Sequence, residues 1–148
     1  LPSEKFFAEA QKKNVGILAR VPLASGLLTG KFSAATSFGE GDHRAPIRVN
    51  EAFSNNEAFG GLDFGKGLEA VEELKAIFGA DTQLSALALK WILMFPEVSC
   101  VIPGASTTTQ VLSNIQAAEL PALTKEQMQQ IKQVYEKYIS PNLAHVLW

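Results

Sequence analysis

The chain has 148 residues, of which 47% are hydrophobic, and its formal net charge is -2. These values fit one globular domain, and no apolar run reaches the roughly 18 residues that span a bilayer. The near-balanced charge, without a dense stripe of lysine and arginine, argues against a nucleic-acid-binding surface. One cysteine, Cys100, can build neither a disulfide framework nor a multi-thiolate metal site within one chain, so we expect a cytoplasmic protein without a metal.

The first predicted elements are a helix and a strand. Ser3 and the glutamate after it suit a helix N-terminus, two lysines suit its C-terminal end, and Asn14 is expected to stop it. Residues 15–21 then alternate between two faces, and three of the four residues on one face are β-branched, which is typical of a mostly buried strand. Pro22 ends this strand. The connection over residues 23–62 lacks regular periodicity, and we interpret a connection of this length as functional.

Two helices and a second strand are predicted next. Asp63 is the expected N-cap of a helix that stops at Gly79, and Thr82 is the expected N-cap of the following one. That helix ends before Pro96, and residues 98–102 form a short β-rich run that predicts a second buried strand.

The last third of the chain predicts two more helices. One spans residues 107–118. The pair Thr124 and Gln127 forms a capping-box pattern that opens a final helix running through Tyr138. The tail after Pro141 is expected to be loosely organised.

The element order is helix, strand, long loop, two helices, strand and two helices, which is the rhythm of parallel βα units. Two strands make a marginal sheet, so the sheet should have further members elsewhere, and the chain looks incomplete. We therefore predict an α/β fold in which the strands of residues 15–21 and 98–102 lack a neighbour on at least one side.

Two loops follow the predicted strands, at the end where α/β barrels build their sites. The loop of residues 103–109 leads into a helix, whose first backbone amides can bind an anion, and Gln110 and Asn114 lie one turn apart on that helix. The alternative is an ordinary turn in which Ser106 serves only as an N-cap.

The other loop, residues 22–31, offers glycines for unusual backbone angles and Lys31 for a phosphate. Arg44 is either a second cation for the same ligand or a solvated surface charge. His43 and His145 are interpreted as surface residues, because no metal-ligand spacing surrounds them.

Three segments in this order resemble the aldo-keto reductase family: VPLASGLLTGK at residues 21–31, ALKWIL at residues 88–93, and VIPGAS at residues 101–106 with Gln110 and Asn114. The resemblance covers about residues 6–135. It implies that the two strands correspond to the seventh and eighth of a (β/α)8 TIM barrel. The expected fold is the C-terminal portion of that barrel, with about two parallel strands and five helices. Residues 1–148 would be one C-terminal segment of the domain, and the N-terminal part of the barrel would be absent.

The resemblance also implies an NADP(H) site. The family positions along the cofactor pyrophosphate match Pro22, Leu23, Ala24 and Ser25. The basic positions of the flap that closes over the pyrophosphate match Lys31 and Arg44. The positions that contact the adenosine ribose, its 2'-phosphate and the adenine match Gly104, Ser106, Gln110 and Asn114. Ser106 stands where many members have an arginine, and Ser113 where many have a glutamate. The preference for NADP over NAD is therefore an expectation from the family.

The resemblance further implies an oxidoreductase that reduces carbonyls to alcohols. The family's catalytic tetrad of Asp, Tyr, Lys and His lies in upstream barrel loops, and Tyr135 and Tyr138 are interpreted as packing residues. We therefore assign no catalytic residue and expect the chain alone to be inactive, with a carbonyl substrate bound only if the rest of the barrel is present. The alternatives are a non-catalytic nucleotide-binding or interaction module, similar to channel-associated subunits and able to self-associate through exposed strand edges, or an inactive truncated fragment.

Overall fold

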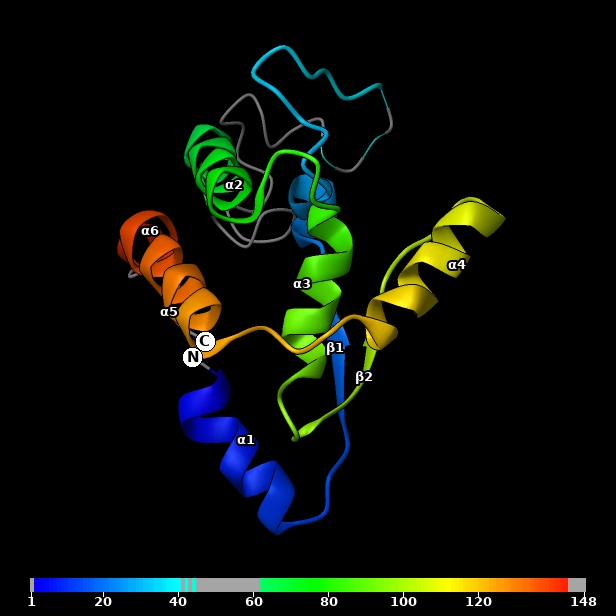
Figure 1. Ribbon diagram of the computed structural model, residues 1–148, viewed down its shortest axis with the longest axis vertical. Helices are drawn as coiled ribbons and strands as arrows, with labels where there is room; N and C mark the ends of the chain where they lie inside the picture. Colours follow the sequence, from blue (N-terminus) through cyan, green and yellow to red (C-terminus); the bar gives the residue numbers. More distant parts are fainter. Residues whose placement is uncertain (1, 41, 43, 45–61, 144–148) are drawn as a thin grey trace. The chain divides into compact units, whose positions relative to one another are not determined.

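The computed structural model describes residues 2–40, 42, 44 and 62–143 (Figure 1). The chain divides into two compact units, which are described separately. Unit 1 contains Leu1–Pro22 and Ala86–Leu123, and unit 2 contains Leu23–Ser85 and Thr124–Trp148. The elements in chain order are α1 (Pro2–Lys12), β1 (Ile17–Arg20), the 3-10 helix η1 (Ala24–Thr29), α2 (Phe64–Phe78), α3 (Leu84–Leu93), β2 (Val98–Ile102), α4 (Thr108–Gln116), the 3-10 helix η3 (Ala117–Glu119), α5 (Lys125–Val134), the π-helix η4 (Tyr135–Ile139) and α6 (Ser140–Leu143).

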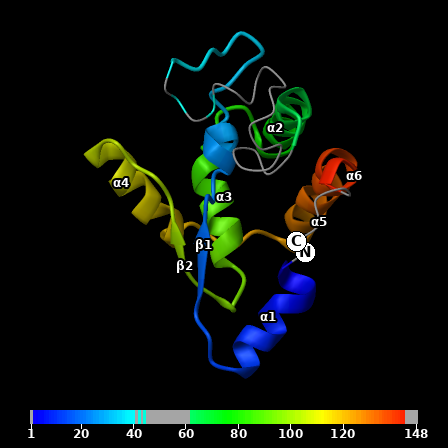
Figure 2. The same cartoon turned by 180° about the vertical axis from the view of Figure 1, so that it is seen from behind.

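Unit 1 is built around β1 and β2, which pair in parallel as predicted (Figures 1 and 2). The register places Leu18 opposite Cys100, with an irregularity just before it. At that irregularity the backbone N–H of Ile17 donates to the side-chain hydroxyl of Ser99 at 3.2 Å. Within the described residues each strand has one neighbour only, so the predicted lack of partners at the sheet edges is confirmed.

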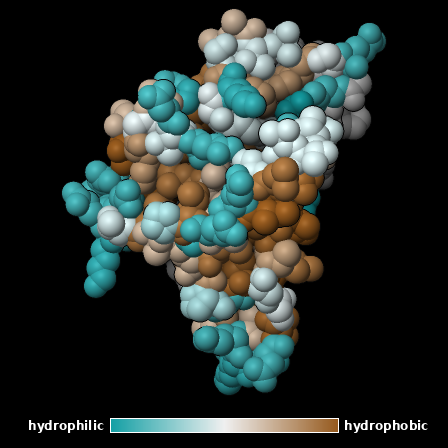
Figure 3. Space-filling view, turned by 45° about the vertical axis from the view of Figure 1, so that its right-hand side comes forward, coloured by the Kyte–Doolittle hydropathy of each residue, from teal (hydrophilic) through white to brown (hydrophobic). Residues whose placement is uncertain are grey.

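The two strands are less buried than their β-branched pattern predicted. Leu18 is 65% exposed, Ile102 is 55% exposed, and Cys100 is exposed as well. A two-stranded sheet leaves most of its surface without a neighbouring strand, so the expectation of buried strands is wrong for this chain by itself. Every exposed large hydrophobic residue that the structure describes belongs to unit 1: Phe6, Val15, Leu18, Val21, Ile102, Val111, Leu112, Ile115 and Leu120. Hydrophobic surface of this kind is visible in Figure 3.

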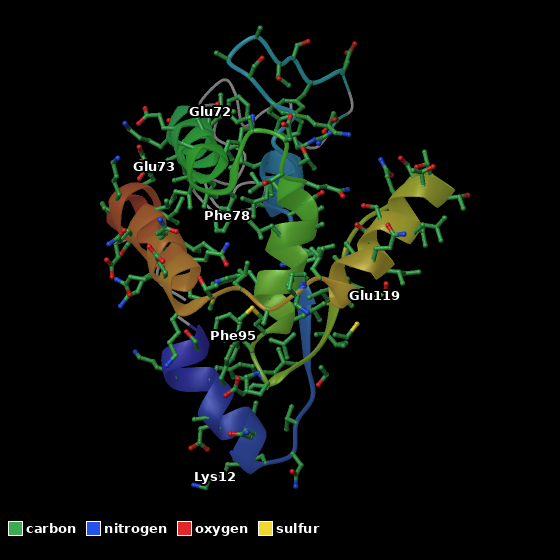
Figure 4. The ribbon with its side chains drawn as sticks, viewed as in Figure 1. Lys12, Glu72, Glu73, Phe78, Phe95 and Glu119 are labelled. Atoms are coloured by element: carbon green, nitrogen blue, oxygen red, sulfur yellow. The ribbon has the colours of Figure 1, made fainter. Side chains whose placement is uncertain are left out.

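The buried hydrophobic residues of unit 1 lie on its helices and on β1. Leu89 is almost fully buried on α3, and Ala117 is buried at the end of α4. Phe95, which is labelled in Figure 4, makes edge-on ring contacts with Phe7 and Trp91, at centroid distances of 5.6 and 5.0 Å. These contacts pack the segment just before β2 against α1 and α3.

Unit 2 contains η1, α2 and the C-terminal helices. Asp63 caps α2 by accepting a hydrogen bond from the backbone N–H of Lys66, and Gly79 ends the helix, as predicted. The prediction that Thr82 caps α3 is wrong. Its hydroxyl donates instead to the carbonyl of Phe78, which closes the end of α2.

The final helix of unit 2 is longer than predicted. The capping box of Thr124 and Gln127 is present, with both reciprocal hydrogen bonds. The helix continues through η4 into α6, so residues 142 and 143 are helical where a loose tail was expected, and the rest of that tail lies outside the described residues. Tertiary contact explains the extension, because the Tyr138 hydroxyl and the Lys137 ammonium both donate to Glu73 on α2, at 2.7 and 2.6 Å. Glu73 is labelled in Figure 4.

Candidate functional site

The first candidate loop follows β1 and has an unusual backbone. Val21, Ala24 and Ser25 have positive φ values of 51°, 47° and 54°, and Gly26 has φ of 97°. A positive φ in a non-glycine residue costs about 1–3 kcal/mol and persists only where surrounding contacts impose it, commonly at ligand-binding loops. The sequence did not predict this 3-10 turn, because no local propensity favours it.

Packing and backbone hydrogen bonds hold the turn in place. The N–H groups of Gly26 and Leu28 both donate to the carbonyl of Leu23, at 2.9 and 3.1 Å. Leu27 is buried beneath the turn. A Cβ built on Gly67 of α2 would lie only 2.7 Å from a methyl carbon of Leu27, so a glycine there allows the helix and the turn to approach each other.

Arg44 returns to this turn from a distant point in the sequence. Its Nη1 donates to the carbonyl of Ser25 at 3.3 Å, while Nε and Nη2 donate to the two carboxylate oxygens of Asp42 at 2.9 and 2.6 Å. The guanidinium also lies against the rings of Phe38 and Phe32, at 4.9 and 5.6 Å from their centroids. The hydrogen bond that Arg44 donates to Asp42 raises the pKa of Arg44 above its ordinary value, so the side chain keeps its positive charge.

The other residues predicted to bind the cofactor at the loop of residues 22–31 lie in or next to the turn. Leu23 and Ala24 belong to the turn itself, and Pro22 is buried at the end of unit 1. Lys31 is exposed just after the turn, and its backbone N–H donates to the hydroxyl of Thr29 at 3.4 Å. His43 and His145 lie outside the described residues.

The second candidate loop joins β2 to α4 in unit 1. Thr107, not Ser106, is the N-cap of α4, so the simple alternative in which Ser106 caps the helix is wrong. The backbone N–H and the hydroxyl of Ser106 both donate to the side-chain oxygen of Gln110, at 2.7 and 3.1 Å. Farther along the helix, the side-chain amide of Asn114 donates to the carbonyl of Gly104 at 3.4 Å.

The structure thus brings the predicted residues together in two groups. Ser25 and Arg44 are in contact in unit 2, and the four residues of the second loop form two hydrogen-bonded pairs in unit 1, Ser106 with Gln110 and Gly104 with Asn114. Sequence reasoning missed Asp42 and Thr107. Both left a signal, because Asp42 stands two residues before an arginine and Thr107 stands three before Gln110, the spacing already noted at the final helix.

The chemistry of both groups suits an anionic, polar ligand. The first offers a permanent guanidinium and an exposed lysine beside a strained turn. The second offers hydroxyl and amide groups at a helix N-terminus, and a Cβ on Gly104 would meet nothing within 4 Å, so a ligand can approach the backbone there. Over the described part of the chain, no group of three or more His, Cys, Asp or Glu residues could hold a metal ion.

Parallel strands that each lead into a polar loop, with helices between them, are the βα units of an α/β barrel. The chain belongs to the aldo/keto reductase family, whose model matches residues 1–136. The resemblance noted in the sequence is thereby confirmed, and the fold is a partial TIM barrel with two parallel strands and several helices.

Similar proteins include enzymes and channel-associated proteins. A probable voltage-gated potassium channel subunit beta from Arabidopsis thaliana is 32% identical over 82% of this chain, and an L-glyceraldehyde 3-phosphate reductase from Escherichia coli O157:H7 is 30% identical over 83%. The matches cover 36% and 34% of those two proteins, so this chain spans about a third of their length.

Among solved structures, the glycerol dehydrogenase from Gluconobacter oxydans superposes with a TM-score of 0.70 at 27% identity, covering 93% of this chain and 39% of that one. The holo form of an aldo-keto reductase from Bacillus halodurans gives a TM-score of 0.61 at 28% identity, covering 90% and 38%. In the described residues, no helix combines the length and apolar character needed to cross a membrane.

Proposed function

We propose that this chain is the C-terminal, cofactor-binding portion of an NADP(H)-dependent aldo-keto reductase that reduces carbonyls to alcohols in the cytoplasm. The observation that carries the proposal is the guanidinium of Arg44 held against the Ser25 carbonyl of a strained turn that follows a barrel strand. A fixed cation beside such a turn is suited to a phosphate group, and barrels commonly bind phosphate after their last two strands.

In this proposal each loop binds one part of the dinucleotide. Residues 22–25 lie along the pyrophosphate, whose charge Lys31 and Arg44 neutralise. In the second loop, Ser106, Gln110 and Asn114 hydrogen-bond the adenosine end, where Gly104 leaves the backbone open to the ligand. Because Ser106 already donates to Gln110, a ligand at this loop must share or replace that hydrogen bond.

The bound cofactor supplies a hydride, and the residues of this chain supply binding and orientation. The catalytic tetrad is proposed to lie on the part of the barrel that precedes these strands. Tyr138 donates its hydroxyl to Glu73, which supports the interpretation that it has a packing role. The chain alone should therefore bind the nucleotide without turning over a carbonyl.

The exposed apolar surface of unit 1 supports the proposal that other strands complete the barrel. Leu18 on β1 and Ile102 on β2 are both more than half exposed, and α4 contributes further exposed apolar residues. Burying apolar surface contributes roughly 25 cal/mol per Å², so covering these strands with the rest of a barrel would stabilise the chain substantially.

The proposal is tested by titrating the purified chain with NADPH and following the cofactor fluorescence, alone and with the preceding part of the barrel supplied as a separate polypeptide. Carbonyl-dependent oxidation of NADPH by the mixture would support the proposal that this chain is a portion of a reductase. Arg44→Ala should weaken binding, whereas Lys132→Ala, which removes an exposed ion pair on α5, should leave it unchanged. If neither preparation binds NADPH, the cofactor assignment is wrong.

A second candidate function is a nucleotide-binding subunit without turnover. It is favoured by the similarity to channel beta subunits in Arabidopsis thaliana and, at 31% identity, in rice. Nucleotide binding and self-association by the chain, with no carbonyl-dependent oxidation even when the preceding part of the barrel is added, would favour this candidate over a reductase.

A further inference from the structure

The side chains around Arg44 form a cluster that the proposed function does not explain. Phe32, Phe38 and Phe64 pack against one another, with ring centroids 5.5 to 6.3 Å apart. Arg44 lies against two of these rings, and its side chain is only 27% exposed. A guanidinium held between aromatic rings and a carboxylate has lost most of its freedom to reorient.

The hydrogen bonds of the guanidinium determine which of its edges can meet a ligand. An arginine side chain has five N–H donors, and Asp42 takes two of them, on Nε and Nη2. The Ser25 carbonyl takes a third, on Nη1. Two donors, one on each terminal nitrogen, therefore have no hydrogen-bond partner within the described residues. Since Nη1 already touches Ser25, this terminal edge faces the strained turn.

Gly26 shows how closely the arginine and the ring approach that turn. A Cβ on Gly26 would lie 3.0 Å from the nearest atom of Phe32 and 3.3 Å from Nη1 of Arg44. The turn, the ring and the guanidinium therefore form one packed group. Any displacement of the arginine would have to disturb all three.

We propose that Asp42 is a positioning residue, which with Phe32 and Phe38 orients Arg44 so that its terminal N–H groups meet a phosphate group of the ligand at residues 25–26. Asp42 acts through Arg44 and does not touch the ligand. This inference rests on the proposed nucleotide-binding function. The carboxylate has two opposing effects, since it aligns the donors and also repels an anion, and the proposal states that alignment dominates.

The test compares Asp42→Ala with the wild type by titration with NADPH and, separately, with inorganic pyrophosphate, in whichever preparation binds. Asp42→Ala should weaken binding about tenfold, the effect of misaligning one charge-assisted hydrogen-bonding group. Asp42→Glu should recover part of the affinity. The control Glu69→Ala also removes a carboxylate from an ion pair in unit 2, with Lys66 at 2.9 Å, and should have no effect.

Two further measurements separate positioning from a general structural role. In an Arg44→Ala background, Asp42→Ala should produce no further loss, because its effect passes through the arginine. The Nε–H resonance of Arg44 in an NMR spectrum should be protected in the wild type and lost in Asp42→Ala, while circular dichroism stays unchanged.

Equal or tighter nucleotide binding by Asp42→Ala would refute this inference alone, because the carboxylate would then be neutral or a competitor of the ligand. A wild-type chain that binds neither NADPH nor pyrophosphate in any preparation would refute the proposed function and this inference together.

Discussion

The contact between α2 and the turn of residues 24–29 makes a sharp prediction about Gly67→Ala. The new Cβ would lie 2.7 Å from a methyl carbon of Leu27, which is only 4% exposed and has little room to move. Overpacking of a buried site costs about 1–3 kcal/mol. Alanine in a helix interior is favoured over glycine by about 1 kcal/mol, which offsets part of that cost. The net expectation is a loss of roughly 1 kcal/mol in the free energy of unfolding.

The same substitution should have the opposite effect once the clash is removed. Leu27→Ala alone should cost about 2–5 kcal/mol, as for other buried leucines. In that background Gly67→Ala should stabilise the protein by about 1 kcal/mol, because only the helix preference remains. Urea unfolding followed by far-UV circular dichroism measures all four members of this double-mutant cycle.

The control is Gly65→Ala in the first turn of the same helix. Its Cβ would meet only a carboxylate oxygen of Asp63, at 3.1 Å, so we expect a change smaller than about 1 kcal/mol. If Gly67→Ala stabilises the wild type as much as it stabilises Leu27→Ala, then α2 and the turn are not in contact in solution, and the reasoning fails. Because Leu27 belongs to the turn that carries Ser25, Gly67→Ala should also weaken nucleotide binding.

Two further predictions concern the C-terminal helices. Thr124→Ala removes the side-chain acceptor of the capping box with Gln127 and should lower the free energy of unfolding by about 1 kcal/mol, measured by urea unfolding. Hydrogen bonds from Lys137 and Tyr138 lower the pKa of Glu73 below its ordinary value of 4.5, so its contribution to stability is present above that pH and is lost as the pH falls through the lowered value. The Glu73 bond raises the pKa of Lys137, whose contribution is present below its ordinary value of 10.5 and is lost as the pH rises through the higher one. Glu73→Gln should remove the acid dependence from the thermal unfolding curve and weaken the alkaline one, because Tyr138 also raises the pKa of Lys137; an unchanged acid limb would contradict the assignment.

Features fixed by short-range chemistry could be predicted from the sequence. The capping box at Thr124, the N-cap at Asp63 and the stop at Gly79 each depend on residues within one helical turn, and each is observed. The second strand, Val98–Ile102, has the predicted bounds, because the β-rich run lies between a proline and a glycine-containing loop, which limit where the strand can begin and end. Local signals were therefore sufficient wherever local contacts decide the structure.

The features that were missed depend on tertiary contacts. No propensity favours positive φ at Val21, Ala24 and Ser25, and their conformation depends on the burial of Leu27 against a helix far along the chain. Thr82 was expected to cap the next helix, but its hydroxyl donates to the carbonyl of Phe78 in the preceding helix. The sequence could indicate Arg44 as a cation, whereas the aromatic rings that hold it come together only in the folded unit.

The strand pattern and the loop contacts carry different information about this chain. The β-branched residues of β1 and β2 are typical of strands that are covered on both faces, and the described residues do not provide this cover. By contrast, the contacts that shape the two loops are complete within each unit: Arg44 reaches Ser25 in one, and Asn114 reaches Gly104 in the other. Covering the strands should therefore raise the stability of the chain much more than it changes either loop. Each loop should keep its own geometry before the barrel is completed.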